Sequence, residues 1–236
     1  MDINQQNHTY HVAQSSMELL PNYYHWIYRK FRQYIHGDVL ELGCGAGHGI
    51  HHYIELATTV VAVDFNQNLL DIVEKKFPNK VLTIFTDLNK EWDKLSDYKF
   101  DAIILMDVIE HFKDDKIFLK KVKQLLKPNG ILIGKVPAQK NLYCKIDEAS
   151  GHYRRYDESD VVMLLESIDF KMLNVSRINP LAAVAYRIKM SHQKNFSSTF
   201  SETELKIINW IIPILALFDY LPYLPGLSII FVAKNK

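Results

Sequence analysis

The chain has 236 residues, which is long enough for one large domain. Hydrophobic residues make up 48% and charged residues 23%, as in an ordinary soluble globular protein. Lys and Arg (28) nearly balance Asp and Glu (27), which argues against a nucleic-acid partner. The two cysteines, Cys44 and Cys144, lack the spacing of metal ligands, and the polar N-terminus lacks the apolar run of a signal peptide. We therefore expect a cytoplasmic protein without a disulfide framework.

Residues 1–35 are predicted to form an N-terminal helical flap. Residues 1–16 are polar, whereas from Met17 to Ile35 apolar and aromatic side chains recur at helical spacing. Aromatic helix faces usually belong to a core, which favours a helix packed on the edge of a sheet. The alternative is that its tyrosines, Tyr24 among them, close over a bound ligand.

Five alternations of strand and helix follow this flap. The predicted strands are almost continuously apolar and lie at 39–42, 58–64, 81–87, 100–107 and 130–137. Helices are expected at 48–57, at 69–77 with Asn66 as its N-cap, and at 118–126. Strands of this kind are typical of a parallel sheet whose two faces are both covered. The sequence therefore predicts an α/β fold.

The chain changes in character after the fifth strand. A helix at 158–168 and a strand at 170–178 precede a stretch of apolar helical patterns interrupted by prolines, and a closing strand follows at 227–233. We interpret residues 180–226 as an apolar helical insertion before the last strand.

Residues 207–218, within this insertion, are nearly all apolar. They are too few to span a bilayer, which needs about 20 residues. Three interpretations remain for them: a lid over a bound ligand, which we favour, an interface between copies of the chain, or a surface that contacts a membrane. The oligomeric state itself cannot be predicted from the sequence.

The stretch from Val39 to Gly49 joins the first predicted strand to a loop containing four glycines. A strand that leads into such a loop is how an open parallel sheet presents a crevice to a nucleotide-like ligand. The dinucleotide pattern Gly-x-Gly-x-x-Gly fails, because its third glycine would be His48 or Ile50. A P-loop is excluded as well, since no Gly-Lys-Ser/Thr follows.

Three of the predicted strands end in aspartate, at Asp64, Asp87 and Asp107. Open α/β sheets bind ligands at the carboxyl ends of their strands. These carboxylates are therefore expected at one edge of the sheet, beside the glycine loop. The alternative for Asp64 and Asp87 is an ordinary turn or helix cap.

These features together resemble the class I S-adenosylmethionine-dependent methyltransferases of the small-molecule type. The stretch Glu41-Leu-Gly43-Cys-Gly45-Ala-Gly47 is similar to their first motif, and Asp64 to their ribose-binding acid. Asp87-Leu88 is similar to the pair beside the adenine, and Leu126–Gly130 to the turn before their fifth strand. The resemblance covers about residues 36–179, with 227–236 as the final antiparallel strand. It implies a single Rossmann-like domain over residues 1–236, whose seven-stranded, mostly parallel sheet is covered by helices on both faces.

The implied cofactor is S-adenosyl-L-methionine, whose chemistry suits these residues. A carboxylate at Asp64 can accept hydrogen bonds from two ribose hydroxyls, Asp87 from the adenine amine, and Phe65 offers an apolar face. The cofactor has no phosphate, which fits a glycine loop without Lys or Arg, and its cationic sulfonium suits nearby carboxylates. The expected cofactor-binding residues are Tyr24, Glu41, Gly43, Cys44, Gly45, Gly47, Asp64, Phe65, Asp87, Leu88, Met106 and Asp107.

Two histidines are candidates for the general base that removes a proton from the methyl acceptor, His111 and His152. The alternative is a metal ion at Asp107, Glu110 and His111, because some relatives resembling ubiquinone-pathway O-methyltransferases carry an acidic-x-x-Glu-His pattern that binds a divalent cation. We expect no metal. A zinc site at His48, His51 and His52 is also disfavoured, since a solvated helix face accounts for their spacing.

The acceptor is expected to be recognised by Gly151-His-Tyr-Arg-Arg-Tyr156, which resembles a motif at the acceptor mouth of related methyltransferases. Here Tyr153, Arg154 and Arg155 are the candidate substrate-binding residues, since an arginine can pair with a carboxylate or phosphate. The alternative is that these arginines pair with Asp157 or Glu158 and only support the next helix.

The predicted function is methyl transfer to an oxygen, less readily a nitrogen, of a small hydrophobic metabolite or natural-product intermediate. One alternative is an enzyme that acts at the membrane surface on a lipid-linked or glycan intermediate. Another is a protein that binds the cofactor without catalysis.

Overall fold

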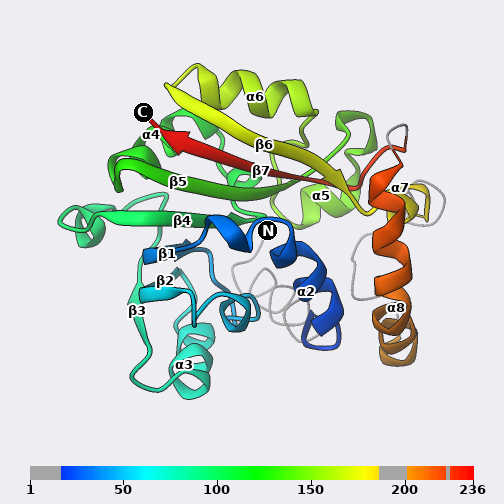
Figure 1. Ribbon diagram of the computed structural model, residues 1–236, viewed down its shortest axis with the longest axis horizontal. Helices are drawn as coiled ribbons and strands as arrows, with labels where there is room; N and C mark the ends of the chain where they lie inside the picture. The colour runs from blue at the N-terminus through cyan, green and yellow to red at the C-terminus, as the bar shows by residue number, and fades with distance from the viewer. Residues whose placement is uncertain (1–16, 186–200, 222–223) are drawn as a thin grey trace.

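A seven-stranded sheet forms the centre of the computed structural model, which describes residues 17–185, 201–221 and 224–236 (Figure 1). The strand order is β3-β2-β1-β4-β5-β7-β6. Strands β1 to β5 pair in parallel, whereas β7 is antiparallel to both β5 and β6. The predicted sheet and its antiparallel last strand are therefore confirmed. The strands are β1 (Gly37–Leu42), β2 (Ala57–Asp64), β3 (Val81–Phe85), β4 (Phe100–Met106), β5 (Leu126–Pro137), β6 (Phe170–Ile178) and β7 (Ser228–Asn235).

Helices cover both faces of this sheet. On one face, buried residues of α4 and α6 pack with strand residues such as Leu40 and Ile103. On the other, buried residues of α2, α3 and α8 pack with Val39 and Ile104. Neighbouring strand residues thus face opposite cores, as the pleat requires. The helices are α2 (Pro21–Arg29), α3 (Gln67–Lys76), α4 (Asp115–Gln124), α5 (Lys145–Ala149), α6 (Glu158–Glu166), α7 (Pro180–Ala185) and α8 (Glu202–Leu215).

Side-chain caps set where several helices begin. The Asn66 side chain accepts a hydrogen bond from the Asn68 amide at the start of α3, as predicted. Asp114 caps α4 in the same way, and Ser201 forms a capping box at α8. Such caps satisfy backbone amides that the first helical turn leaves without a partner.

The helix predicted at 48–57 is wrong. The structure has only the 3₁₀ turn Ile50–His52 followed by irregular turns before β2 begins at Ala57. Glycine at positions 47 and 49 disfavours helix, and too few residues remain before β2 for a stable one. The three histidines of this segment therefore do not share the face of a helix.

Between β6 and β7 the described residues form α7, α8 and the 3₁₀ segment Ala216–Tyr220. Residues 186–200 and 222–223 of the predicted insertion lie outside the described residues. Its α8 runs beside α2, where the Asn22 side chain donates a hydrogen bond to the Asn209 carbonyl (2.9 Å). At the other end of α2, Trp26 Nε1 donates to Asp219 Oδ2 (2.7 Å). Within the described ranges, no helix is long and apolar enough to cross a membrane.

Candidate functional site

The glycine loop begins directly after β1 and bends back against β2. The amides of Gly43 and Cys44 both donate to the Val63 carbonyl, at 2.8 and 3.0 Å. Gly43, Gly45 and Gly47 have φ values of +71°, +53° and +71°, a region that side chains with a Cβ rarely enter. The alternating glycines are therefore required by the backbone path of the loop.

Asp64, at the end of β2, holds this loop in place. Its Oδ2 accepts the Gly45 amide (2.9 Å) and its Oδ1 accepts the Asn66 amide (2.9 Å). The side chain is buried in this arrangement. A carboxylate oxygen can accept more than one hydrogen bond, and contact of Asp64 with a ligand stays a prediction.

Asp87 lies on the same edge, two residues beyond the end of β3. Its Oδ1 accepts the Asn89 amide (3.0 Å), and its Oδ2 pairs with Lys90 (3.0 Å). Burial would raise the pKa of Asp87, but these partners outweigh it and lower the pKa. Phe65 is largely exposed near this edge, and Leu88 packs against the core.

Glu41 is buried and is held by two tyrosines. Tyr28 of α2 donates to Oε1 (3.0 Å) and Tyr53 to Oε2 (2.7 Å). Burial raises the pKa of Glu41 to about 7. A Cβ on Gly49 would lie 1.9 Å from the Tyr28 hydroxyl, so this fourth glycine makes room for the tyrosine. Contact between Glu41 and a cofactor stays a prediction.

The remaining predicted cofactor residues surround the loop. The half-buried Tyr24 ring lies 5.6 Å from that of His48, which stands between Gly47 and Gly49. Cys44 is buried, and burial raises the pKa of its thiol. Met106 ends β4 and packs against the core on the α2 side of the sheet.

Asp107 follows β4 in a left-handed conformation, with φ +54°. Its Oδ2 pairs with Lys135, a buried side chain near the end of β5. Burial would lower the pKa of Lys135, but Asp107 beside it raises the pKa above its usual value. Sequence reasoning missed Lys135. A single cation in the otherwise apolar predicted strand 130–137 could have indicated a buried ion pair.

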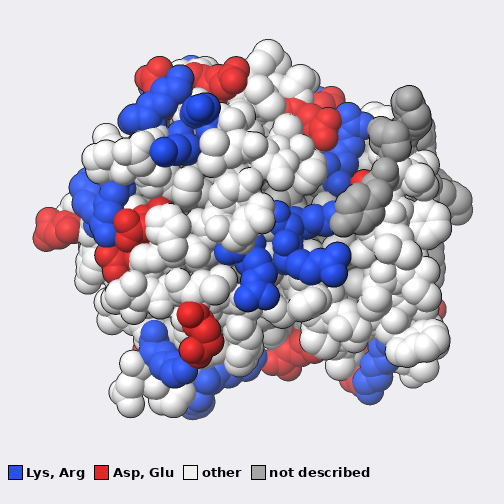
Figure 2. All heavy atoms as spheres, in the orientation of Figure 1, with Lys and Arg blue, Asp and Glu red and all other residues white. Residues whose placement is uncertain are grey.

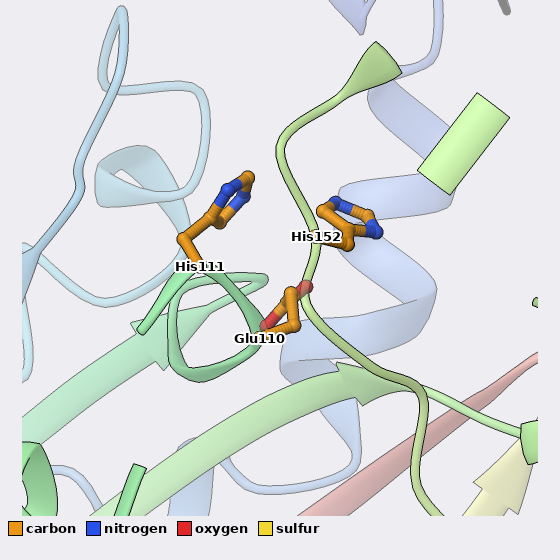
Figure 3. A group of neighbouring side chains, drawn as sticks. All are labelled: Glu110, His111 and His152. Carbon is orange, nitrogen blue, oxygen red and sulfur yellow. The ribbon is translucent and has the colours of Figure 1, made fainter. Parts of the chain in front are cut away.

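Glu110, His111 and His152 form a cluster beside this pair (Figure 3). One ligand atom from each lies within 4.8 Å of the others. Glu110 is fully buried, and among the described residues neither of its carboxylate oxygens has a hydrogen-bond partner. Burial raises the pKa of Glu110 well above its usual value and lowers that of His111 to about 4.

The composition of this cluster differs from the metal alternative drawn from the sequence. His152 stands where Asp107 was expected, because Asp107 is turned to Lys135. Among the described residues, Glu110, His111 and His152 are the group of donors that could share an ion.

His152 is oriented by a carboxylate that sequence reasoning missed, Asp147 of α5. Its Oδ1 lies 3.1 Å from His152 Nδ1 and 2.9 Å from Arg155 Nε. Burial would raise the pKa of Asp147, but the hydrogen bonds from His152 and Arg155 outweigh it and hold the pKa at about 2. No sequence signal identifies Asp147, because the contacts form only when α5 folds back on the loop.

The two arginines of the motif have internal partners, but not the expected Asp157 and Glu158. Arg155 is buried against Asp147 and donates to the Ala138 carbonyl (3.2 Å). Arg154 pairs with Asp115 of α4 (2.7 Å). Asp157 instead caps α6, and contact of either arginine with an acceptor stays a prediction.

A surface pocket of about 410 Å³ adjoins this motif. Exposed Tyr153 contributes to its wall, and the Tyr153 amide donates to the Glu110 carbonyl (2.8 Å), which joins the pocket wall to the histidine cluster. None of the predicted cofactor residues lines this pocket. Its lining is Asp115, Lys140, Tyr143, Tyr153, Arg154, Arg155, Tyr156, Asp160, Met163 and Leu164.

The architecture defines the class of protein. A glycine loop after β1, carboxylates after β2, β3 and β4, and an antiparallel β7 beside β5 make up the Rossmann-like methyltransferase fold.

Comparison with known sequences agrees with this class. The family model Methyltransf_11, a methyltransferase domain, matches residues 40–134. The ubiquinone biosynthesis O-methyltransferase of Bartonella bacilliformis is 31% identical over 97 residues, which are 40% of this chain and 38% of that protein. A probable S-adenosylmethionine-dependent methyltransferase of Mycolicibacterium smegmatis is 26% identical over 140 residues, which are 57% of this chain and 52% of that protein. The chain thus spans about half or less of the curated relatives it matches.

Solved structures share the fold at low sequence identity. Coclaurine N-methyltransferase, bound to N-methylheliamine and S-adenosylhomocysteine, superposes with a TM-score of 0.58 at 18% identity, over 88% of this chain and 70% of that one. An S-adenosylmethionine-dependent methyltransferase from Mesorhizobium loti superposes with a TM-score of 0.60 at 16% identity, over 85% of this chain and 92% of that one. Residues 40–134 thus match the model of a methyltransferase domain, and the chain shares its fold with solved methyltransferases.

Proposed function

We propose that this protein uses S-adenosyl-L-methionine to methylate an oxygen of a small, hydrophobic acceptor. The observation that carries the proposal is the coincidence of the matched methyltransferase domain with Asp64 and Asp87 at one edge of the sheet. Asp64 contacts the glycine loop, and Asp87 lies one strand further along the sheet.

The residues at this edge fit the cofactor. Asp64, which accepts the Gly45 amide of the loop, is the proposed acceptor for the ribose hydroxyls. Exposed Phe65 offers a face to the adenine, and Asp87 is accessible to its amine. Three predicted binding residues of the loop, Gly43, Gly45 and Gly47, carry no charge and suit a ligand without phosphate. When bound, the cofactor supplies a methyl group on a cationic sulfonium.

The proton of the acceptor hydroxyl goes to His152 in this proposal. Burial lowers the pKa of His111 to about 4, which makes it a weak base. His152 is instead held by Asp147, whose carboxylate stabilises the imidazolium as it forms. Most of the rate is expected from holding the acceptor in line with the methyl group.

Oxygen as the acceptor is supported by the relatives named ubiquinone biosynthesis O-methyltransferase, whereas coclaurine N-methyltransferase keeps nitrogen open.

The hydrophobic character of the acceptor is inferred from the apolar insertion 180–226, which we propose acts as a lid. That α2 closes over the ligand as a flap is part of the same proposal. Arg154 and Tyr153, in the wall of the adjoining pocket, are the proposed contacts to the acceptor.

The cofactor assignment is tested by calorimetric titration with S-adenosylmethionine. Asp64→Ala should abolish measurable binding, because the ribose loses its acceptor and the Gly45 amide loses its anchor. Asp93→Ala, at an exposed position far from the loop in sequence, is the matched control and should bind like the parent protein. Unchanged affinity in Asp64→Ala would remove the ribose assignment.

The transfer itself is tested by S-adenosylhomocysteine formation with panels of phenols, catechols and amines. His152→Gln should lower kcat about 100-fold or more with little change in cofactor affinity, because general-base catalysis contributes on that order. Asp147→Asn should also lower kcat and shift its pH profile. Cofactor binding without product on any acceptor would favour a non-catalytic binding protein.

Activity should be insensitive to EDTA, since we propose no metal. A metal content near one ion per chain, lost together with activity in Glu110→Gln, would instead favour the metal alternative at Glu110, His111 and His152.

A further inference from the structure

The outward face of α8 and the 3₁₀ segment after it is apolar and exposed. Five large apolar side chains project from it, and Trp210 among them is 76% exposed. Pro213 is exposed between them, and Ile211 and Phe218 are half-buried, so the apolar face is broad. The five residues are Ile207, Trp210, Ile214, Leu217 and Leu221; we call them the α8 face.

This face is not needed to attach α8 to the domain. The opposite side of the helix buries Leu205 and Ile212 in the core that contains α2. Hydrogen bonds between Asn22 and Asn209 secure the same side. Stretches of exposed apolar surface of this kind mark sites of interaction.

The α8 face lacks charge along its whole length. Asp219 is the charged residue of the stretch 207–221, and its side chain is buried against Lys30 (2.9 Å). The exposed acids Glu202 and Glu204 are confined to the first turn of α8, next to Lys206.

Cations lie beside the other end of the face. Arg29, at the end of α2, and Arg32, in the turn that follows, are exposed. In the described ranges, neither has a carboxylate within ion-pair distance. Lys30, between them, pairs with Asp219 and so fixes this end of α2 next to the end of the α8 face. Figure 2 shows Lys and Arg atoms gathered where α2 lies in Figure 1, beside a broad uncharged surface over α8.

We propose that the α8 face docks on the surface of an anionic lipid bilayer. A helix that presents Trp, Ile and Leu on one side and has neighbouring cations lies in the membrane interface, where Trp is at its most stable. Arg29 and Arg32 meet the negative headgroups. A bilayer also accommodates a broad convex face without the shape complementarity that a protein partner must supply.

The distribution of charge sets the orientation. The end at Ile214, Leu217 and Leu221 lies deepest, because Glu202 and Glu204 at the start of α8 are repelled by anionic headgroups. Docking would also hold α2 close to the lipid surface. Tyr28 of this helix donates a hydrogen bond to Glu41, next to the glycine loop. The proposal concerns this surface alone and does not depend on methyl transfer.

Co-sedimentation of the full chain with phosphatidylcholine vesicles containing phosphatidylglycerol tests the proposal. Trp210→Ser combined with Ile214→Ser should weaken vesicle binding about tenfold or more, because two large apolar contacts with lipid are lost. The control combines Leu82→Ser in β3 with Ile117→Ser in α4, whose exposed fractions of 51% and 55% are close to the 58% of Ile214. The control should bind like the parent.

Arg29→Gln combined with Arg32→Gln should weaken binding to anionic vesicles several-fold and change binding to pure phosphatidylcholine little. Tryptophan emission of the parent should shift to the blue with vesicles, and this shift should vanish in Trp210→Phe, which retains an aromatic ring. No vesicle binding, or equal loss in the control, would overturn the proposal. A dimer in sedimentation velocity that the Trp210/Ile214 variant converts to monomers, without vesicle binding, would assign the face to a second copy.

Discussion

The contact between Asp107 and Lys135 illustrates how two charges of one ion pair differ in their surroundings. The side chain of Lys135 is almost entirely buried, whereas that of Asp107 remains 44% exposed. Water can therefore solvate Asp107 alone but not Lys135 alone. Removing the carboxylate leaves an uncompensated buried charge, which is the costly case for a buried pair.

We accordingly predict an asymmetry between the two deletions. Asp107→Asn, which tolerates the left-handed backbone, should lower the free energy of unfolding by about 3 kcal/mol. Lys135→Met should cost about 1 kcal/mol, because the remaining carboxylate stays hydrated. Urea denaturation measures both. The double variant should be more stable than Asp107→Asn alone, and equal costs for the two single variants would contradict this account.

For individual residues, the sequence predicted the place in the fold better than the contacts that each residue makes. The positions of the loop glycines, Asp64 and Asp87 follow from strand ends and local pattern. The partners of Glu41 and Arg155 do not, because Tyr28 and Asp147 come from separate elements that meet only in the folded chain.

Among the elements, α2 connects the glycine loop to the insertion. Tyr28 contacts Glu41 on one side, while Trp26 and Lys30 both contact Asp219 on the other. Asp219 also accepts the Asn179 amide (2.9 Å), which joins the end of β6 to the same carboxylate.

Asp219→Ala should therefore loosen α2 and the insertion together. The change leaves Trp26 Nε1 and Lys30 without their acceptor, and we expect a loss of about 3 kcal/mol in the free energy of unfolding. Amide exchange in α2 and in residues 216–221 should accelerate, with α4 unaffected. Glu202→Ala, exposed at the start of α8, is the control. Faster exchange confined to the insertion would contradict coupling through α2.

The elements themselves were predictable to different degrees. Strands β2, β4 and β6 match their predicted ranges within one residue. For β4 the reason is a continuous apolar run bounded by turns, which is a strong local signal. The helix predicted after the glycine loop is absent from this described segment. The reversal of the chain and the packing of Tyr53 determine the conformation of the segment, rather than helical periodicity. Residues 1–16 of the predicted flap lie outside the described residues.

For the whole molecule, two buried groups give stability opposite dependences on pH. Glu41 has a usual pKa of 4.5 and a folded pKa of about 7, so the folded chain binds more protons between these values and stability falls as pH rises. His111 has a folded pKa of about 4 against 6.5, so its contribution is lost as pH falls through that range. The two effects oppose each other near pH 5 to 6.

Glu41→Gln should isolate the first effect. The free energy of unfolding of the variant relative to the parent should increase by about 3 kcal/mol between pH 4.5 and pH 7.5, because the variant has no carboxyl to ionise in the core. Denaturant titrations at a series of pH values measure this difference. For the complementary variant His111→Asn, the free energy of unfolding relative to the parent should decrease as pH rises. If the free energy of unfolding of Glu41→Gln relative to the parent did not change with pH, the raised pKa of Glu41 would be contradicted.

The sequence by itself determined the sheet, the glycine loop and the carboxylates at the strand ends, because these depend on periodicity and on backbone requirements that neighbouring residues set. Only the tertiary structure decided that Asp147 orients His152, that Lys135 faces Asp107, and that Tyr28 and Tyr53 enclose Glu41. These contacts join residues on different elements, whose approach depends on the packing of the whole chain. The exposed α8 face was also decided by the tertiary structure, because the sequence of an apolar helix does not say which of its sides the core will cover.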